Sequence, residues 1–144
     1  MSTRSWWAWA GAALAGLLAL GQAGATQPTW TPQFWKNEST LKLCTTVPDE
    51  GSYCFPVWLV VLDDDVYVRL GSRAAERVSK NKSAPFLPVE IGGRRYEQVR
   101  ASETPDYAER VAQAMANKYW SDIFARLFSH PLTMRLRPDQ PPPP

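Results

Sequence analysis

The chain has 144 residues, 44% of them hydrophobic, which suits one globular domain with a single core. Its 16 basic and 14 acidic residues give a formal net charge of +2, so it lacks the basic excess of nucleic-acid-binding domains. One histidine and two cysteines are too few for a metal site of ordinary composition. The composition therefore predicts a small globular protein with neither a nucleic-acid partner nor a resident metal.

The N-terminus has the order of a cleavable signal peptide over residues 1–25. Arg4 gives a positive charge, an apolar run follows over 6–20, and Ala23-Gly24-Ala25 supplies the small residues that a signal peptidase requires. A membrane anchor is the alternative, but the apolar run is shorter than the roughly 20 residues that span a bilayer. We therefore expect an exported protein, periplasmic or secreted, that starts near Thr26 and has no stable membrane span after cleavage.

Aromatic and β-forming residues follow the signal peptide. A short helix is expected over 33–39, which would place Phe34 and Trp35 in the core. Alternating residues then predict strands over 41–47 and 53–62, joined by a turn that contains proline and glycine. This part of the chain is thus expected to form an antiparallel hairpin.

Cys44 and Cys54 lie on these two strands, close to the turn that joins them, where a cross-strand bridge is plausible. In an oxidising compartment, an isolated pair this close in sequence most simply forms a disulfide. A redox-active pair usually has two residues between its sulfurs, whereas nine residues separate these cysteines. We therefore expect a structural disulfide between Cys44 and Cys54.

Asp63-Asp64-Asp65 predicts the next tight turn, and a third strand is expected over 66–70. The acidic triplet has two interpretations, a hairpin tip kept soluble by its charge and a calcium loop. It lacks the alternating oxygen ligands and the terminal glutamate of a calcium loop, which favours the hairpin tip.

The middle of the chain predicts a short helix over 73–80, with Ser72 as its N-cap. A fourth strand is expected over 85–91, and its two prolines make it an edge strand or an interrupted one. Gly92-Gly93 predicts a hairpin turn into a fifth strand over 95–101.

The last third predicts a long helix and a closing strand. Thr104 and Pro105 favour a helix start, and the helix is expected to run to about Phe128. Its apolar stripe, which would pack against a sheet, comprises Val111, Met115, Tyr119, Ile123 and Leu127. A final strand is expected over 132–137, and residues 138–144 form a proline-rich tail that is expected to be disordered.

This order of elements predicts an α+β fold, with a six-stranded antiparallel sheet curled into a small barrel and a long C-terminal helix over residues 26–137. The sequence resembles the split β-barrel family related to pyridoxamine-phosphate oxidases and flavin reductases, and most closely an uncharacterised branch of it. The segments that carry the resemblance are Leu43-Cys44-Thr45-Thr46, Phe55-Pro56-Val57-Trp58-Leu59-Val60-Val61, Val66-Tyr67-Val68-Arg69, Lys80-Asn81, Lys118-Tyr119 and Thr133-Met134-Arg135-Leu136.

The resemblance implies a homodimer with flavin mononucleotide or a deazaflavin bound in a cleft between subunits. The family holds the cofactor phosphate at the end of the third strand and in the following helix, which corresponds here to Arg69, Ser72 and Arg73, with Lys80 beyond them. Arginine presents a planar fork to phosphate oxygens, and a helix N-terminus adds backbone N–H groups. By the same resemblance, the aromatic residues beside the ring system are Trp58 and Tyr67.

The sequence departs from the family within this helix, where many members carry a further lysine. Here that neighbourhood is Ala74-Ala75-Glu76, and an acid repels phosphate. The alternative interpretation is that Arg69 and Arg73 are surface residues paired with Glu76 and its neighbours. The lone arginine of the leader argues against the twin-arginine route, so an exported chain would acquire any flavin outside the cytoplasm.

Two classes of function follow. The first is an exported flavin-type barrel, acting as an oxidoreductase or as a cofactor carrier with a small anionic ligand. The second is a cofactor-free periplasmic protein with a ligand-binding or structural role; an exported inhibitor or interaction module is a third idea that no residue supports. No catalytic residue is identified, because His130 is alone and lies beside Pro131, as turn residues do.

Overall fold

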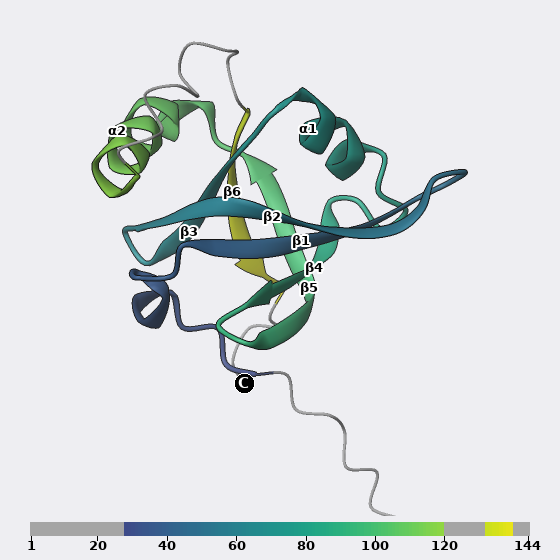
Figure 1. Cartoon of the computed structure of the whole chain (residues 1–144), viewed down its shortest axis with the longest axis horizontal. Coiled ribbons are helices and arrows are strands. Elements are labelled where there is room, and N and C mark those ends of the chain that lie inside the picture. The colour runs from purple at the N-terminus through teal and green to yellow at the C-terminus, as the bar shows by residue number, and fades with distance from the viewer. Residues whose placement is uncertain (1–27, 120–131, 140–144) are drawn as a thin grey trace, which may run out of the picture.

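A computed structural model describes residues 28–119 and 132–139 (Figure 1). Six antiparallel strands form a closed barrel in the order β1-β2-β3-β6-β5-β4. The strands are β1 (Thr40–Val47), β2 (Gly51–Leu62), β3 (Asp65–Leu70), β4 (Phe86–Ile91), β5 (Arg94–Glu103) and β6 (Leu132–Pro138). The predicted α+β class and all six predicted strands are confirmed. The predicted signal peptide and residues 140–144 of the tail lie outside the described residues.

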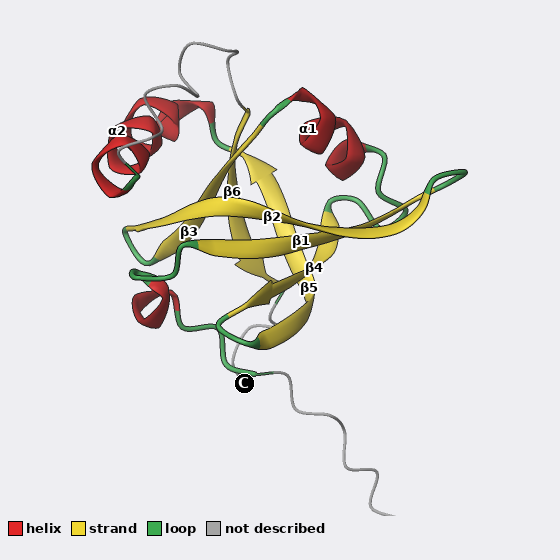
Figure 2. Cartoon of the chain, in the orientation of Figure 1, coloured by secondary structure: helices red, strands yellow, loops and turns green. Residues whose placement is uncertain are grey.

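Among the described residues, four short helical segments lie outside the barrel wall (Figure 2). They are η1 (Pro32–Trp35), α1 (Ser72–Ser79), η2 (Pro105–Tyr107) and α2 (Ala108–Lys118). Within residues 28–119 and 132–139, no helix is long and apolar enough to cross a membrane.

The barrel interior is filled by one face of each strand, as the alternation of apolar residues predicts. One end is closed by α1, whose Val78 is buried in the core. The other end is closed by Trp30, Trp35 and Tyr96, whose rings meet edge to face with centroids 4.8 to 5.5 Å apart. Phe34, which was expected in the core, is 80% exposed. The expectation was wrong because a tight 3₁₀ turn points consecutive side chains in different directions.

A second, smaller core lies on the outer face of the barrel. Here α2 packs over β2 and β3, and the buried residues are Val60, Tyr67, Val111 and Met115. The helix ends at Lys118 rather than continuing unbroken to Phe128, because Tyr119 takes an extended conformation (φ −121°, ψ 96°). The remaining predicted stripe residues, Ile123 and Leu127, lie outside the described residues.

One predicted helix start is shifted and the other is correct. Gly71 occupies the N-cap position of α1, and Ser72, the predicted cap, is the first helical residue, without a capping side-chain bond. Thr104 occupies the N-cap position of η2, Pro105 is its first helical residue, and η2 continues directly into α2. Thr104 makes no capping bond, however, and its buried hydroxyl has no hydrogen-bond partner.

The acidic triplet is a hairpin tip, as predicted. Asp63 and Asp64 both have positive φ (49° and 65°), the conformation that a two-residue hairpin turn requires. Two arginines from other elements balance the charge: Arg110 lies 2.9 Å from Asp63, and Arg137 lies 2.7 Å from Asp65.

β2 changes partner along its length. Residues 51–58 pair with β1, whereas residues 59–62 pair with β3. The β1–β2 hairpin therefore projects beyond the rest of the barrel as an arm, here defined as residues 44–56 (Figure 1). Pro56 lies within this arm, opposite Lys42 of β1.

β4 is interrupted, as its prolines predict, but it is not an edge strand. It pairs with β5 through a register shift between Leu87 and Val89, and it pairs with β1 at only two positions. The same register would place Thr46 opposite Phe86, where no backbone pair forms. Instead, the buried Asn81 side chain accepts from the Thr46 N–H at 2.7 Å and donates to the Phe86 C=O at 2.8 Å. The line along which β1 meets β4 and closes the barrel is here called the β1–β4 seam, and a side chain continues it beyond the last backbone pair.

Candidate functional site

Trp58 and Arg69 belong to one outer face of the barrel. Leu59 pairs with Val68 at the end of the β2–β3 ladder and both side chains point into the interior, so alternation turns Trp58 and Arg69, each one residue further along its strand, to the outer face. On its other side, Arg69 pairs with Thr133 of β6. Arg69 is half-buried and interacts with its surroundings. Two of the predicted ligand residues therefore belong to the same outer face of the barrel.

Trp58 is held as a rigid aromatic surface. Its ring stacks in parallel on Tyr119, with centroids 4.6 Å apart and an interplanar angle of 3°, and 37% of Trp58 remains exposed. The Tyr119 hydroxyl has one proton, which it shares between two acceptors within hydrogen-bond distance, the backbone C=O groups of Ser39 (2.7 Å) and Leu59 (2.9 Å). Sequence reasoning assigned Tyr119 to the buried helix stripe and missed this role, since the end of α2 was misplaced.

Lys118 bonds to the same stretch of backbone as Tyr119. Its Nζ donates to the backbone C=O groups of Glu38 and Leu59, and it lies 5.2 Å from the centre of the Tyr119 ring. Burial lowers the pKa of the Lys118 ammonium from its usual value of 10.5. Lys118 and Tyr119 together satisfy the backbone where the β1–β2 ladder ends, which fixes the position of Trp58.

Tyr67 lies away from any open surface. It is 1% exposed beneath α2, and its ring stacks on Tyr107 with centroids 5.3 Å apart. Burial raises the pKa of its phenol above 10.0, and the nearby Asp65 charge acts in the same direction. In this chain, Tyr67 therefore contributes packing beneath α2 rather than a surface beside a ligand.

Arg73 is exposed on the first turn of α1 and faces the arm. It lines a hollow of about 690 Å³ between α1 and β2, together with Tyr53, Phe55 and Arg77, and a smaller hollow of about 170 Å³ beside Lys80. Neither hollow is lined by Arg69 or Ser72. The two hollows that Arg73 lines are therefore formed by α1 and the arm, without the other predicted phosphate ligands at the end of β3.

Glu76 pairs with Lys80, and the nearby Arg73 charge also acts on it, which agrees in part with the interpretation that Glu76 balances Arg73. Its carboxylate accepts from the Lys80 Nζ at 2.6 Å. This hydrogen bond lowers the pKa of Glu76 and raises the pKa of Lys80. Lys80 is therefore engaged within its own helix.

Arg77 was not identified from the sequence, yet it joins α1 to the arm. Its guanidinium donates to the Thr45 hydroxyl (3.1 Å), the Glu50 carboxylate (2.7 Å) and the Gly51 C=O (3.3 Å), and it lies over the Tyr53 ring. An arginine on an exposed helix gives no sequence signal for such contacts, because they depend on how the arm bends over α1.

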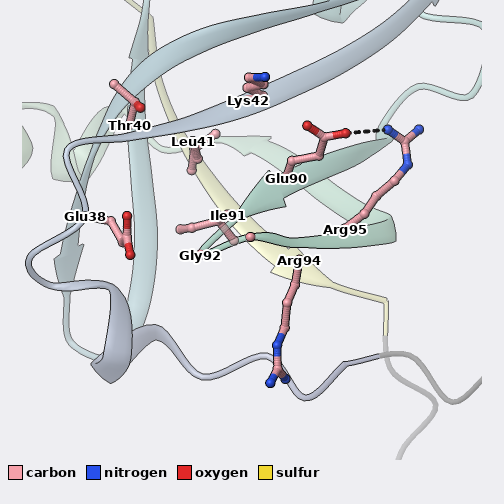
Figure 3. A pocket seen from close by; sticks show the side chains of 10 residues that line it. Glu38, Thr40, Leu41, Lys42, Glu90, Ile91, Gly92, Arg94 and Arg95 are labelled. Atoms are coloured by element: carbon pink, nitrogen blue, oxygen red, sulfur yellow. Dashed lines mark hydrogen bonds and ion pairs between the residues drawn. The ribbon is translucent and has the colours of Figure 1, made fainter.

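A hollow of about 480 Å³ lies where β1 and β4 separate (Figure 3). Its charged residues have both signs, and Glu90 pairs with Arg95 across 3.0 Å. The full lining comprises Glu38, Thr40, Leu41, Lys42, Glu90, Ile91, Gly92, Gly93, Arg94 and Arg95. The hollow lies where β1–β4 pairing ends, and its mixed charges favour no single class of ligand.

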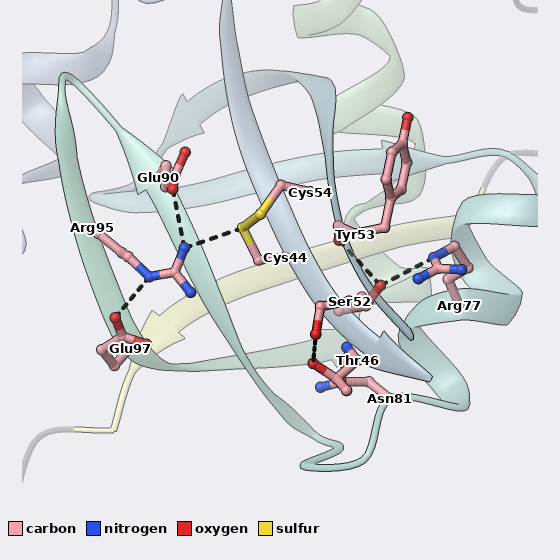
Figure 4. The surroundings of a disulfide bond; sticks show 11 residues. Cys44, Thr46, Ser52, Tyr53, Cys54, Arg77, Asn81, Glu90, Arg95 and Glu97 are labelled. Atoms are coloured by element: carbon pink, nitrogen blue, oxygen red, sulfur yellow. Dashed lines mark hydrogen bonds and ion pairs between the residues drawn. A yellow bond between two sulfur atoms is a disulfide. The ribbon is translucent and has the colours of Figure 1, made fainter. Parts of the chain in front are cut away.

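The predicted disulfide between Cys44 and Cys54 is present (Figure 4). The two cysteines face each other directly in the β1–β2 register. The bridge lies at the base of the arm and joins its two strands there.

No protein-family model and no curated protein matches the chain. Several solved structures are similar to it in fold. HutZ, the heme storage protein from Vibrio cholerae, is 17% identical with a TM-score of 0.57, over 76% of this chain and 88% of HutZ. The F420-H2-dependent reductase FDR-A is 12% identical with a TM-score of 0.54, over 69% of this chain and 95% of the reductase. A structure described as a domain-swapped dimer is 12% identical with a TM-score of 0.54, over 69% of this chain and 81% of that one.

These similarities, together with the closed six-stranded antiparallel barrel and its C-terminal helix, confirm the predicted resemblance: the chain has the split β-barrel fold.

Proposed function

We propose that this chain is an exported split-barrel protein that binds a flat, anionic ligand of the flavin type. The observation that carries the proposal is the exposed Trp58 ring, stacked on Tyr119 and directed to the same outer face of β2 and β3 as Arg69. A fixed indole offers a surface for a planar ring system, and a guanidinium on the same face attracts an anionic group.

The solved neighbours support the choice of ligand class. One is described as a heme storage protein and another as an F420-H2-dependent reductase. Heme and deazaflavins are both flat aromatic molecules that carry acidic groups. The chemistry of Trp58 and Arg69 suits the same class, and an oxidoreductase and a cofactor carrier both require such a site.

A homodimer is part of the proposal. The exposed large apolar residues of the described chain include Tyr53 and Trp58, both on β2, and Tyr53 stacks on Phe55. Exposed aromatic patches on small domains mark interaction surfaces. By strand alternation Tyr53 and Phe55 lie on the face of β2 opposite to Trp58. A second copy that covers the Trp58 face would bring one of its own hollows, such as the one lined by Arg73, next to that face. One solved neighbour is described as a domain-swapped dimer.

The test is a titration of the mature protein, residues 26–144, with flavin mononucleotide, followed by tryptophan fluorescence. We expect a Kd tighter than about 10 µM, equivalent to about −7 kcal/mol. Arg69→Gln and Trp58→Ala should each weaken binding at least tenfold, and Arg73→Glu should do so if the dimer brings α1 to the site. Arg94→Gln, on the hairpin at the other end of the barrel, is the matched control and should leave the affinity unchanged.

The second candidate is a cofactor-free periplasmic protein with a ligand-binding or structural role. The Glu76–Lys80 pair favours it, since it removes one cation from the set that the resemblance implies. No flavin binding up to millimolar concentration would support this candidate and contradict the first. Hemin in a parallel titration distinguishes a different flat anion from no ligand at all.

Export and assembly are tested separately. N-terminal sequencing of protein from the periplasm or medium should begin near Thr26, and protein that retains residues 6–20 in the membrane would contradict export. Light scattering at micromolar concentration should give a dimer mass, and a monomer mass would contradict the shared site.

A further inference from the structure

The two sulfurs of the disulfide differ in access and in partners. Cys44 is 5% exposed on β1, whereas Cys54 is exposed on the arm. The Arg95 Nη1 of β5 donates to the Cys44 sulfur at 3.5 Å (Figure 4). An external thiol therefore reaches Cys54 more readily, while a guanidinium lies beside Cys44.

The charges around the bridge come from three strands. β5 supplies Arg95 and Glu97, β4 supplies Glu90, and β1 supplies Lys42 opposite Glu90. Arg95 is fixed by Glu97 at 2.7 Å and by Glu90 at 3.0 Å. A Glu90 carboxylate oxygen also lies within 4.8 Å of both sulfurs, in the only such cluster among the described residues. The two carboxylates offset the two cations, but only Arg95 donates to a sulfur.

We propose that the Cys44–Cys54 bridge is a thiol-exchange site, with Cys54 as the attacked sulfur and Cys44 as the leaving thiolate held by Arg95. A positive group beside a cysteine stabilises its thiolate, and a more stable thiolate leaves faster in exchange. The asymmetry of the site thus selects one direction of attack. This activity is independent of flavin binding and needs no ligand on the Trp58 face.

The reaction partner is a dithiol reductant. One of its thiolates attacks the Cys54 sulfur, the bond between the two cysteine sulfurs breaks, and the electron pair leaves with Cys44. The second thiol of the reductant, as a thiolate, then attacks the reductant sulfur of the mixed disulfide, which closes the reductant's own disulfide. Cys54 leaves as a thiolate and takes up a proton, so two electrons pass from the dithiol to the protein.

Reduction would release the base of the arm. The bridge lies between the barrel and the arm tip, where Arg77 contacts Glu50 and the Tyr53 ring. A reduced arm is still held by β1–β2 pairing, by Arg77 and by the bonds of Thr46 to Asn81 and Lys82. It loses its covalent link, so its position over α1 becomes dependent on the redox state. The site thereby links an external reductant to the shape of the hollow lined by Arg73.

The first test measures the rate at which excess dithiothreitol reduces the mature protein, by alkylation and intact mass. We expect Arg95→Gln to slow reduction about fivefold or more, because the leaving thiolate loses its cation. Glu90→Gln should accelerate it, because a carboxylate near the sulfurs is removed and Arg95 has one competitor fewer. Arg94→Gln is the matched control and should stay within about twofold of wild type. Rates for Arg95→Gln and Glu90→Gln that are unchanged, or that move in the same direction, would overturn the proposal.

The second test maps the attacked sulfur. Glutathione is added with an alkylating trap, and peptide mass spectrometry locates the products. We expect glutathione on Cys54 and the alkyl group on Cys44; equal products, or glutathione mainly on Cys44, would overturn the proposal.

A third test guards against variants that fail to fold. In Cys54→Ser, the pKa of the Cys44 thiol is read from the pH dependence of its alkylation, with circular dichroism to verify folding. It should lie below the usual value of about 8.5, rise when Arg95→Gln is added, and return with Arg95→Lys. A value at or above the usual one in the folded protein would contradict the role of Arg95, whatever the result of the flavin titration.

Discussion

The β3–β6 and β1–β4 seams close the same barrel in different ways. Across β3–β6, residues 66–70 face residues 132–136 in an unbroken register of five pairs. Across β1–β4 only two pairs form, and Asn81 supplies the next bonds from its side chain. A backbone ladder survives the loss of one side chain, whereas a seam continued by one residue depends on that residue. The comparison predicts where the barrel is easiest to open.

The largest effect is expected at Asn81. Asn81→Ala leaves the Thr46 N–H and the Phe86 C=O without partners in a partly buried seam, and each unsatisfied group costs about 1–3 kcal/mol. We expect a loss of about 2–4 kcal/mol in the free energy of unfolding, measured by urea denaturation. Asn117→Ala, an exposed asparagine on α2, is the control. An Asn81→Ala variant as stable as this control would contradict the contrast between the seams.

The Lys118 side chain also bonds to backbone groups, at the end of the β1–β2 ladder. Lys118→Met preserves most of the side-chain length but removes the donor to the C=O groups of Glu38 and Leu59. We expect a loss of about 1–3 kcal/mol, less than at Asn81 because Tyr119 still donates to Leu59. Trp58 should also become more mobile, which a lower fluorescence anisotropy would report. Lys36→Met, at an exposed position, should change neither quantity.

An effect limited to alkaline pH is expected from Tyr119. Burial raises the pKa of its phenol above 10.0, so the unfolded chain ionises first as pH rises. The stabilisation is complete below pH 10 and is lost as pH rises through the pKa of the folded state. Melting temperatures should therefore fall more steeply above pH 10 in wild type than in Tyr119→Phe. Equal slopes would show that Tyr119 is not protected at the end of the ladder.

The smallest loss of stability is expected in the β3–β6 seam, which a complete backbone ladder closes. Arg137 makes two bonds of 2.7 Å to Asp65 across β3 and β6, but about half of the arginine side chain is exposed. Exposed ion pairs contribute little, so Arg137→Gln should cost no more than about 1 kcal/mol. A larger loss, measured by the same urea denaturation as for Asn81→Ala, would mean that this seam also depends on a single side chain.

The sequence predicts the strands well because alternation and turn residues are local signals. The acidic hairpin tip and the Gly92-Gly93 turn needed only positive φ at their central residues, and both were found. The role of Asn81 was not predictable, since it depends on two strands that lose their register at one point. The same holds for Arg77 and for Lys118, whose partners are backbone atoms of distant segments.

The candidate site was predicted in part. Trp58 and Arg69 share a face because they follow from strand register, which sequence alternation reveals. Tyr67 was misassigned because strand alternation predicts that its side chain points outward but does not predict which element packs over it. In the structure, α2 covers Tyr67. Arg69 and Arg73 were expected together, and the hollows that Arg73 lines are formed by α1 and the arm and do not include Arg69. The Arg95–Cys44 contact joins residues that are far apart in sequence and left no local signal.

Pro56 has a consequence for how this protein avoids polymerising. Thr46 directs both backbone groups toward Asn81 and Lys82, so its pair with Ser52 is of the non-hydrogen-bonded type. Every second pair of an antiparallel ladder has the same geometry, so the pair of Pro56 with Lys42 is also of the non-hydrogen-bonded type. The backbone of Pro56 therefore faces away from β1, toward the edge of β2 that β3 no longer covers at this point. Exposed strand edges recruit further strands and seed fibrils, and a proline there has no N–H to offer. The arm can thus present its aromatic side chains to a partner while its backbone resists endless sheet growth.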